Sequence, residues 1–264
     1  MKNVALTLLL VFLFGCDVPT ASDSSSSVKV ASVSETPCDS NTGPFGGGSG
    51  TASDPYLICS VDQFKNLTGS YNAIHAELRS DLDFTSISFT ILDQFHGTLD
   101  GKNHEIKGIS LTYGFDAGIF RSIAGTVKNL KLDSITINGS ARSGALAGDM
   151  IGTGSIDNVH VRNSSVTGGT NSAYCAGLII GESYGVITNS TTIGSLTGNR
   201  LGGIVGINRG TVQYVASSVN LSGTIKGRIV GVNYNDVLDC QYPNFAQPGT
   251  NPVGSNNDDI VNCN

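Results

Sequence analysis

The sequence predicts an all-β protein folded as a parallel β-solenoid, and three observations support this fold class. Glycine accounts for 34 of the 264 residues and charged residues for only 14%, a composition unlike that of coiled coils or helical bundles. Short segments rich in Ile, Val, Thr and Leu, which β-strands prefer, recur about every 25 residues, and glycines separate them at repeated offsets. The hydrophobic content of 39% is sufficient for a buried core.

The chain begins with the features of an export signal in residues 1–15. A basic start is followed by an apolar run over residues 4–14, which is too short to cross a bilayer as a helix. The run ends in Leu13-Phe14-Gly15-Cys16, which resembles the lipobox of bacterial lipoproteins. This resemblance implies that Cys16 is lipidated and becomes the new N-terminus. An ordinary secretory signal with a cysteine near its cleavage site is the alternative interpretation.

Residues 16–37 follow as a Ser-rich segment with few large apolar side chains. Such a segment cannot bury enough surface to offset the entropy of ordering it, so we expect a flexible tether. Together, the signal and the tether predict an exported protein that is lipid-anchored to the bacterial cell envelope. We expect it at the outer membrane or cell surface rather than at the inner membrane.

Both ends of the predicted solenoid need covers, because open strand edges pair with other chains. Residues 38–73 are interpreted as an N-terminal cap that contains a short amphipathic helix. Ser60 and Gln63 have the spacing of a capping box at the start of that helix. Residues 243–264 are expected to cover the opposite end or to trail from it.

The repeat occupies residues 74–242 and contains three short β-rich elements in each unit. The first elements start 26, 33, 25 and 25 residues apart, at Gly118, Gly144, Gly177, Gly202 and Gly227. The second elements start at Gly125, Gly154, Gly185, Gly210 and Asn235. The third elements close four of the units at Gly139, Gly168, Gly198 and Gly223. The long second interval predicts a loop near residues 168–172, which is either neutral or part of a working face.

One corner of the second element carries Asn129, Asn158 and Asn189, and then Tyr214 and Asp239. Asparagine tolerates left-handed backbone, and its amide can bond to the same amide one coil away. We therefore expect coils stacked about 4.8 Å apart with a short asparagine ladder along one corner. An antiparallel sandwich is the competing architecture, but its turns would recur every 8–12 residues or so without this three-element register.

The N-terminal half adds an ordered series of motifs. They are Gly48–Ile58, Leu67, Ser80–Phe84 and Phe95–Ile106. With the glycine-framed segments they resemble the GLUG-motif β-helix proteins of bacterial surfaces. Related modules occur in filamentous-haemagglutinin-like adhesins and in the N-terminal regions of IgA-cleaving metalloproteases.

This resemblance covers residues 48–242 and implies a right-handed parallel β-helix displayed outside the cytoplasm. It implies no particular ligand. The protease activity of the IgA-cleaving relatives does not carry over, because the chain has no H-E-x-x-H motif. Gly118–Ser122 and Gly227–Gly231 depart from the motif, so we expect irregular terminal coils.

The chain has six cysteines, and an exported protein can keep disulfides. Each end of the solenoid could be stabilised by a local disulfide, Cys38 with Cys59 at one end and Cys240 with Cys263 at the other. Cys175 would then have no disulfide partner. Sequence alone does not determine this connectivity, and Cys240 could instead be a buried free thiol. No Cys or His spacing typical of a metal site occurs, so no metal and no cofactor are predicted.

No catalytic motif is present, and the sequence therefore favours a protein without enzymatic activity. One pair of carboxylates is the exception. Strand alternation places Asp81 and Asp83 on the same outer face, about 6.6 Å apart. With Asp100 they are the candidate catalytic residues, because β-helix lyases and hydrolases use acidic residues on an outer strand face. A solvated surface pair is the simpler interpretation.

The favoured function is adhesion or recognition at the bacterial surface. Tyr174, Tyr184 and Tyr234 are the candidate ligand-binding residues, because tyrosine can stack on sugars or anchor a protein contact. The expected partners are the membrane, through the lipid, and a glycan or protein on another cell surface. A net charge of −6 argues against nucleic acid. A polysaccharide-acting lyase or hydrolase and a structural envelope component are the alternatives.

Overall fold

The computed structural model describes residues 38, 43–241, 251, 253–256 and 261–263. The predicted export signal, the lipidation site Cys16 and the tether therefore lie outside the described residues. Residues 37–264 form one compact unit, and the following description concerns that unit. Among the described residues, no helix has the length and apolar character needed to cross a membrane.

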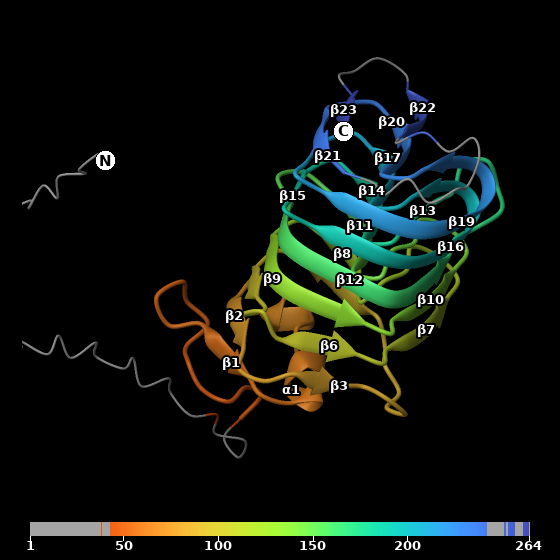
Figure 1. The fold of residues 1–264 in the computed structure, drawn as a ribbon. Coiled ribbons are helices and arrows are strands. Elements are labelled where there is room, and N and C mark those ends of the chain that lie inside the picture. The colour runs from red at the N-terminus through yellow and green to blue at the C-terminus, as the bar shows by residue number, and fades with distance from the viewer. Residues whose placement is uncertain (1–37, 39–42, 242–250, 252, 257–260, 264) are drawn as a thin grey trace, which may run out of the picture. The chain divides into compact units, whose positions relative to one another are not determined.

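The unit is a parallel β-solenoid, as the repeat predicts (Figure 1). Its strands form a 16-stranded sheet and a 7-stranded sheet, and neighbouring strands belong to successive turns of the chain. Corresponding residues of the last turns lie 25 positions apart, as in the pairings Thr191↔Ala216 and Val205↔Val230. Each strand of the smaller sheet marks one turn, so the solenoid has about seven turns.

Most strands have two to four residues, whereas β9 has eight and β12, β16 and β19 have 12 or 13. The larger sheet consists of β1 (Tyr56–Ile58), β2 (His75–Leu78), β3 (Leu82–Asp83), β5 (Thr98–Asp100), β6 (Glu105–Lys107), β7 (Ser110–Tyr113), β9 (Thr126–Asp133), β10 (Thr136–Gly139), β12 (Ser155–Thr167), β13 (Cys175–Gly177), β15 (Val186–Thr188), β16 (Thr191–Gly202), β18 (Thr211–Gln213), β19 (Ala216–Gly227), β21 (Val237–Cys240) and β23 (Val261–Cys263). The smaller sheet consists of β4 (Leu92–Phe95), β8 (Phe120–Ile123), β11 (Ala147–Met150), β14 (Ile180–Ser183), β17 (Val205–Asn208), β20 (Val230–Asn233) and β22 (Val253–Asn256).

The predicted corner column is present in five successive turns. Its members all adopt left-handed backbone with φ between 47° and 54°: Asn129, Asn158, Asn189, Tyr214 and Asp239. The predicted amide ladder is shorter than expected. Asn158 Nδ2 donates to Asn129 Oδ1 at 2.9 Å, but Asn189 Nδ2 donates to Asp157 Oδ1 at 2.7 Å. A carboxylate is a stronger acceptor than an amide, which explains why Asn189 leaves the ladder.

The glycine-framed segments align between turns with one irregularity. Ala147 pairs with Ile180, so Leu146 and Ile179 are equivalent as predicted. In the preceding turn Phe120 pairs with Ala147 instead of Leu146. This shift occurs at Gly118–Ser122, where the sequence departs from the motif. The extra residues of the long interval form the segment 168–174 between β12 and β13, where the loop was expected.

A short helix, α1 (Val61–Lys65), lies at the N-terminal end of the solenoid (Figure 1). The Ser60 side chain accepts a hydrogen bond from the Gln63 N–H, and Gln63 Oε1 accepts one from the Cys59 N–H. The Phe64 ring, fully buried, packs edge-on against Phe84 and Phe120 of the first coils. The helix therefore covers the open end of the core. A single 3₁₀ turn, η1 (Gly69–Tyr71), follows it.

At the other end, β22 and β23 pair with β20 and β21. These strands add one more layer to each sheet, so this part of the C-terminal segment continues the stack. Apart from residue 251, the remaining residues of that segment lie outside the described part of the chain.

Candidate recognition site

Three turns of the solenoid place Tyr184, Arg209 and Tyr234 one above another. Each residue follows a strand of the smaller sheet, namely β14, β17 and β20. The Arg209 N–H donates to the Ser183 carbonyl at 2.7 Å, and the Tyr234 N–H donates to the Asn208 carbonyl at 2.9 Å. The 25-residue spacing equals one turn, so the side chains emerge from the same corner. We call these three residues the tyrosine–arginine corner.

The Arg209 side chain holds this corner together. Its guanidinium carbon lies 4.3 Å from the ring centre of Tyr234 and 5.6 Å from that of Tyr184. Both distances fall within the range of cation–π attraction. Arg209 Nε also donates to Glu182 Oε1 at 2.7 Å, and this hydrogen bond raises the pKa of Arg209. The guanidinium is therefore charged and restrained between the two rings.

Two buried amides support the backbone beneath the corner. Asn208 and Asn233 are fully buried, and Asn208 Nδ2 donates to Asn233 Oδ1 at 2.9 Å. Asn208 Oδ1 accepts a hydrogen bond from the Gly210 N–H at 3.1 Å. Buried amides with satisfied hydrogen bonds rigidify their surroundings. This pair was not among the predicted residues, although the 25-residue spacing of the two asparagines is visible in the sequence.

The corner presents its aromatic surface to solvent. Tyr184 is 47% exposed and Tyr234 is 38% exposed. A shallow hollow of about 340 Å³ lies beside Tyr184 and Arg209, because Gly185 and Gly210 contribute no side chains there. The structure thus brings two of the three predicted tyrosines to one surface, with an arginine that the sequence analysis did not single out.

Tyr174, the third predicted tyrosine, does not join this surface. It lies in the segment before β13, where its ring covers Gly169, and it is 36% exposed. It does not line the hollow beside the corner. The insertion that carries Tyr174 has no equivalent in the other turns, so the repeat does not align it with Tyr184 and Tyr234.

Behind the corner, Glu182 belongs to a buried ionic network. Arg142 lies at its centre, with Nε 3.0 Å from Asp116 Oδ1. Its Nη1 lies 3.1 Å from Asp149 Oδ2 and 3.3 Å from Glu182 Oε2. Glu182 therefore joins Arg142 to Arg209. These carboxylates are far apart in sequence and converge only because successive turns overlie one another.

Within the described part of the chain, Asp149 is the member of this network with an unsatisfied carboxylate oxygen. It is 6% exposed, and its Oδ1 atom has no hydrogen-bond partner among the described residues. Burial raises the pKa of Asp149 to about 6; the Arg142 charge opposes this shift, and the charges of Glu182 and Asp116 add to it. A raised pKa is typical of a catalytic acid. Here, however, the Arg142 guanidinium bridges the three carboxylates, and Asp149 and Glu182 are covered from solvent, so the network is structural.

The predicted catalytic carboxylates do not form a common site. Asp81 and Asp83 are both exposed, as strand alternation predicts, but each is bound to groups of its own. Asp81 Oδ1 accepts a hydrogen bond from the Glu105 N–H at 2.9 Å and lies 3.1 Å from His104 Nδ1. Asp100 lines a hollow that neither Asp81 nor Asp83 reaches.

The electrostatics of these carboxylates argue against an acid–base role. Hydrogen bonds from Thr85 lower the pKa of Asp83 to about 2, with a further contribution from Lys107. The backbone N–H of Glu105 lowers the pKa of Asp81. Burial opposes the ionisation of Asp100, but hydrogen bonds from Asn129 and the Lys102 N–H outweigh it and lower its pKa. All three carboxyls therefore stay ionised, whereas a general acid needs a raised pKa.

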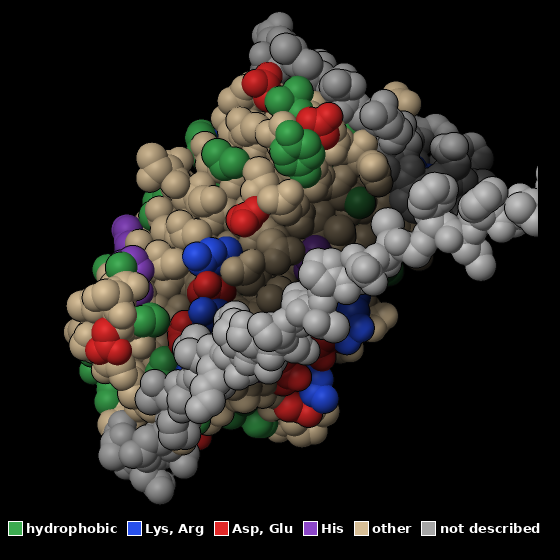
Figure 2. Space-filling view, turned by 60° about the vertical axis from the view of Figure 1, so that its left-hand side comes forward, with side chains coloured by type: hydrophobic (Ala, Val, Ile, Leu, Met, Phe, Trp, Pro, Cys, Tyr) green, Lys and Arg blue, Asp and Glu red, His purple; other side chains and the backbone are tan. Residues whose placement is uncertain are grey.

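Charged side chains concentrate over the first coils. Lys107 Nζ lies 3.1 Å from Asp83 Oδ2, and Lys128 Nζ lies 3.6 Å from Asp100 Oδ2. On the face shown in Figure 2, which keeps the N-terminal coils at the bottom, Lys and Arg side chains appear over the lower and middle coils. The upper coils present uncharged, hydrophobic and a few acidic side chains.

The cysteines follow the predicted pattern in part. Cys38 and Cys59 form a disulfide that ties the start of the described chain to the cap. Cys175 is a buried free cysteine, and burial raises the pKa of its thiol.

Cys240 is disulfide-bonded, which corrects the alternative of a buried free thiol. The register of β21 on β23 places Cys240 beside Cys263. In the described part of the chain, no group of three or more His, Cys, Asp or Glu residues could hold a metal ion.

Comparison with known proteins found one matching family model and two similar sequences. The family model of the M26 IgA1-specific metallo-endopeptidase N-terminal region matches residues 64–163. Over 159 residues, or 58% of this chain, the sequence is 33% identical to halomucin of Haloquadratum walsbyi. Over 141 residues, or 44% of this chain, it is 36% identical to a protein of Evansella cellulosilytica described as a Gly-rich membrane protein.

These relatives are much longer than the matched region. The matches cover 2% of halomucin and 15% of the Gly-rich protein. Among solved structures, an immunoglobulin A1 protease assigned in Bacteroides ovatus is similar, with 18% identity and a TM-score of 0.49 over 84% of this chain and 87% of that one. The family match and the strand pairings agree that this chain is a β-helix resembling the N-terminal region of IgA proteases.

Proposed function

We propose that this protein acts in adhesion or recognition at the bacterial cell surface, and that the tyrosine–arginine corner binds a protein on another surface. The observation that carries the proposal is the exposed Tyr184–Arg209–Tyr234 column, held in place by Glu182. Tyrosine and arginine dominate the binding energy of protein interfaces. Their restraint before binding reduces the entropy lost on association.

The similarity to halomucin and to the Gly-rich membrane protein supports a location in the cell envelope. A lipid on Cys16 would anchor the chain there, at the outer membrane or cell surface. The Ser-rich segment of residues 16–37 would then let the solenoid stand away from the membrane. In this arrangement the solenoid serves as a rigid support, and no catalytic step is needed.

The proposal is tested by binding of the purified full chain, coupled to beads, to host-type and bacterial cells. Replacing Tyr184 and Tyr234 together by alanine should reduce binding at least tenfold, because two anchor residues are lost. Tyr214→Ala is the matched control, since Tyr214 is 56% exposed but lies at a different corner. Trypsin treatment of the target cells should also abolish binding.

Equal binding by the double variant and the wild type would overturn the role of the corner. Binding that survives trypsin but is competed by free sugars would show that a glycan, and not a protein, occupies the corner. Release of sugar fragments from a polysaccharide by the wild-type chain would instead support the alternative of an enzyme.

A further inference from the structure

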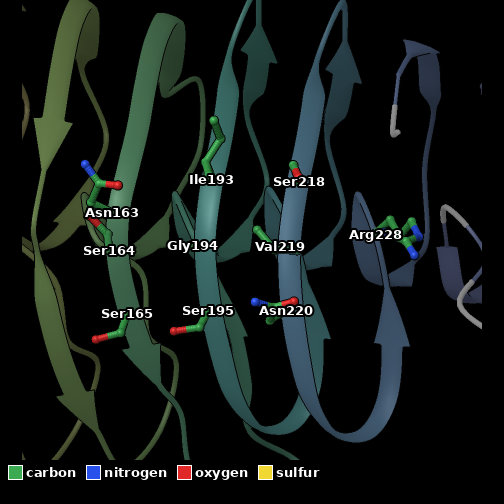
Figure 3. Close-up of a pocket in the computed structure, with 10 residues that line it drawn as sticks. All are labelled: Asn163, Ser164, Ser165, Ile193, Gly194, Ser195, Ser218, Val219, Asn220 and Arg228. Carbon is green, nitrogen blue, oxygen red and sulfur yellow. The ribbon is translucent and has the colours of Figure 1, made fainter. Parts of the chain in front are cut away.

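A second hollow lies across the outer face of the larger sheet, away from the tyrosine–arginine corner. It is an open groove of about 790 Å³, lined by residues of β12, β16 and β19 and by Arg228. Figure 3 shows the lining residues of β12, β16 and β19 side by side, with Arg228 beyond β19. No residue lines both this groove and the hollow at the corner.

The groove begins where β16 has one residue fewer than β12. Residues 162–163 of β12 lie opposite the single residue Ile193 of β16, so the pairing register between the two strands shifts by one. Asn163 adopts left-handed backbone there, with φ of 51°. The next residue of β16, Gly194, lines the groove, but the position of its missing Cβ is taken by the Ser164 carbonyl oxygen, at 2.3 Å, and by the buried Leu178 side chain, at 2.9 Å. The groove therefore coincides with the missing residue of β16, and the small side chains of Ser195 and Ser218 leave it open.

The usual arrangement of apolar side chains inside and polar side chains outside is reversed at Thr192 and Ile193 of β16. The inward column changes from Leu132 and Val161 to Thr192 and Ser217, which are almost fully buried. The Thr192 hydroxyl bonds to the Ser217 hydroxyl and to the Gly203 carbonyl, both at 2.9 Å. These bonds satisfy the hydroxyls but bury less apolar surface than the aliphatic side chains that they replace.

Beside this buried polar pair, Ile193 points outward and is 57% exposed. An exposed isoleucine next to buried hydroxyls lowers stability relative to the opposite arrangement. Departures from the expected pattern without a gain in packing are typical of functional sites. This stretch of β16 therefore has the pattern of a binding surface.

The strand residues that line the groove are uncharged and mostly polar. The register places Ser165, Ser195 and Asn220 in one column, and places Ser218 beside Ile193. None of these four polar side chains has a hydrogen-bond partner among the described residues, and all are accessible. Neighbouring strands are about 4.8 Å apart, which is close to the length that one sugar ring adds to an extended chain. Hydroxyl and amide groups at this interval match sugar hydroxyls, while Ile193 offers an apolar face to the ring.

Other ligand classes fit the groove less well. Its lining contains no carboxylate for a cation, and its one charged residue, Arg228, is 6% exposed and already engaged. An acidic polymer would also meet the net charge of −6. A peptide cannot extend the sheet within the groove, because β16 is paired with β12 on one edge and β19 on the other.

We infer that this groove binds an uncharged polysaccharide, which lies across the coils along the solenoid axis. The site is separate from the tyrosine–arginine corner, and it does not depend on the function proposed for that corner. The bound chain would be held by hydrogen bonds to Ser165, Ser195 and Asn220 and by contact with Ile193.

Native gel electrophoresis of the full chain tests this inference, with mannan, β-glucan or dextran in the gel as neutral probes. Alginate and polygalacturonate are the acidic counterparts. We expect at least one neutral polysaccharide to retard the wild type and the acidic ones to have no effect. Ser195→Trp should raise the dissociation constant at least tenfold by filling the groove, and Ser195→Ala with Asn220→Ala should raise it about tenfold.

Thr197→Ala is the matched control, because Thr197 is exposed on the same strand two residues beyond the groove. It should bind as the wild type does, and so should the variant that lacks Tyr184 and Tyr234. The milder alanine variants keep the test valid if Ser195→Trp does not fold. Failure of the wild type to bind any neutral probe, stronger binding of an acidic one, or wild-type binding by the Ser195 and Asn220 variants would overturn the inference.

Discussion

The outer surface of the first coils, residues 75–133, differs in chemistry from that of the last coils, residues 180–240. In the first coils carboxylates face cations of the next turn, as in Asp83 with Lys107 and Asp133 with Arg162. The last coils expose five large hydrophobic side chains, Tyr184, Val186, Ile193, Tyr214 and Tyr234, whereas the first coils expose Ile87 and Phe115, both of which lie between strands. Both regions nevertheless share one continuous hydrophobic core and the same left-handed corner.

This difference shows that the scaffold and its surface are specified separately. The inward residues and the corners carry the stacking, so the outward residues are free to vary from turn to turn. Ion pairs at an exposed surface contribute little stability, but they keep that surface from making apolar contacts. In our proposal the first coils serve as support, and the last coils present the surfaces for binding.

The largest expected effect comes from replacing one glycine in each region and comparing the losses in the free energy of unfolding. A Cβ atom at Gly118 would lie 2.5 Å from Ala147 Cα, and one at Gly227 would lie 1.7 Å from the Val230 carbonyl oxygen. Because backbone must move in either case, Gly118→Ala and Gly227→Ala should each lower the free energy of unfolding by roughly 4 kcal/mol or more. Urea denaturation measures the change. Gly114→Ala is the control, because no atom lies within 4 Å of the added Cβ. A large loss at only one glycine would contradict a common scaffold.

The N-terminal end provides a second test, through the Cys38–Cys59 disulfide. The two cysteines are 21 residues apart in sequence. Replacing both by serine should lower the free energy of unfolding by about 3 kcal/mol, because the unfolded chain gains the entropy of an open loop of this size. Thermal unfolding under oxidising conditions measures the effect. A negligible change would mean that the cap detaches before the coils unfold, so that the first coils are stable without it.

The boundary between the two regions gives the smallest expected effect, at Asp149. Its pKa in the folded protein is about 6 and its ordinary value is 3.8, so folding favours the protonated carboxyl. This contribution to stability is complete below about pH 4 and is lost as the pH rises through about 6. Between pH 7.5 and pH 5, the wild type should gain on the order of 1 kcal/mol relative to Asp149→Asn. Parallel pH profiles of unfolding for the two proteins would contradict this expectation.

Much of the fold was predictable because a solenoid repeats local signals. The spacing of Gly154, Gly185 and Gly210 indicated the stacked turns, and Asn129 and Asn158 indicated the corner. The capping box at Ser60 indicated the covering helix. Each of these signals acts within one turn or between adjacent turns, so a periodic sequence displays it directly.

The candidate sites were less predictable. Tyr184 and Tyr234 were identified as exposed tyrosines, but the guanidinium of Arg209 between their rings was not. Strand alternation indicated Asp81 and Asp83 as an outer-face pair, with Asp100 as a third candidate. The carboxylates that converge on one guanidinium are instead Asp149, Glu182 and Asp116. Convergence of this kind depends on how side chains from different turns bend toward one another, which periodicity does not reveal.

For this protein, the sequence by itself determined the parallel β-solenoid, the period of its turns and the positions of its corners. It could do so because strand propensity, glycine and left-handed asparagine act locally, and every turn repeats them. Only the tertiary structure decided which side chains meet across turns: the Arg209 bridge, the ionic network at Arg142 and the groove at Gly194. These features depend on side-chain packing and on a one-residue change of register, which become defined only when the turns stack.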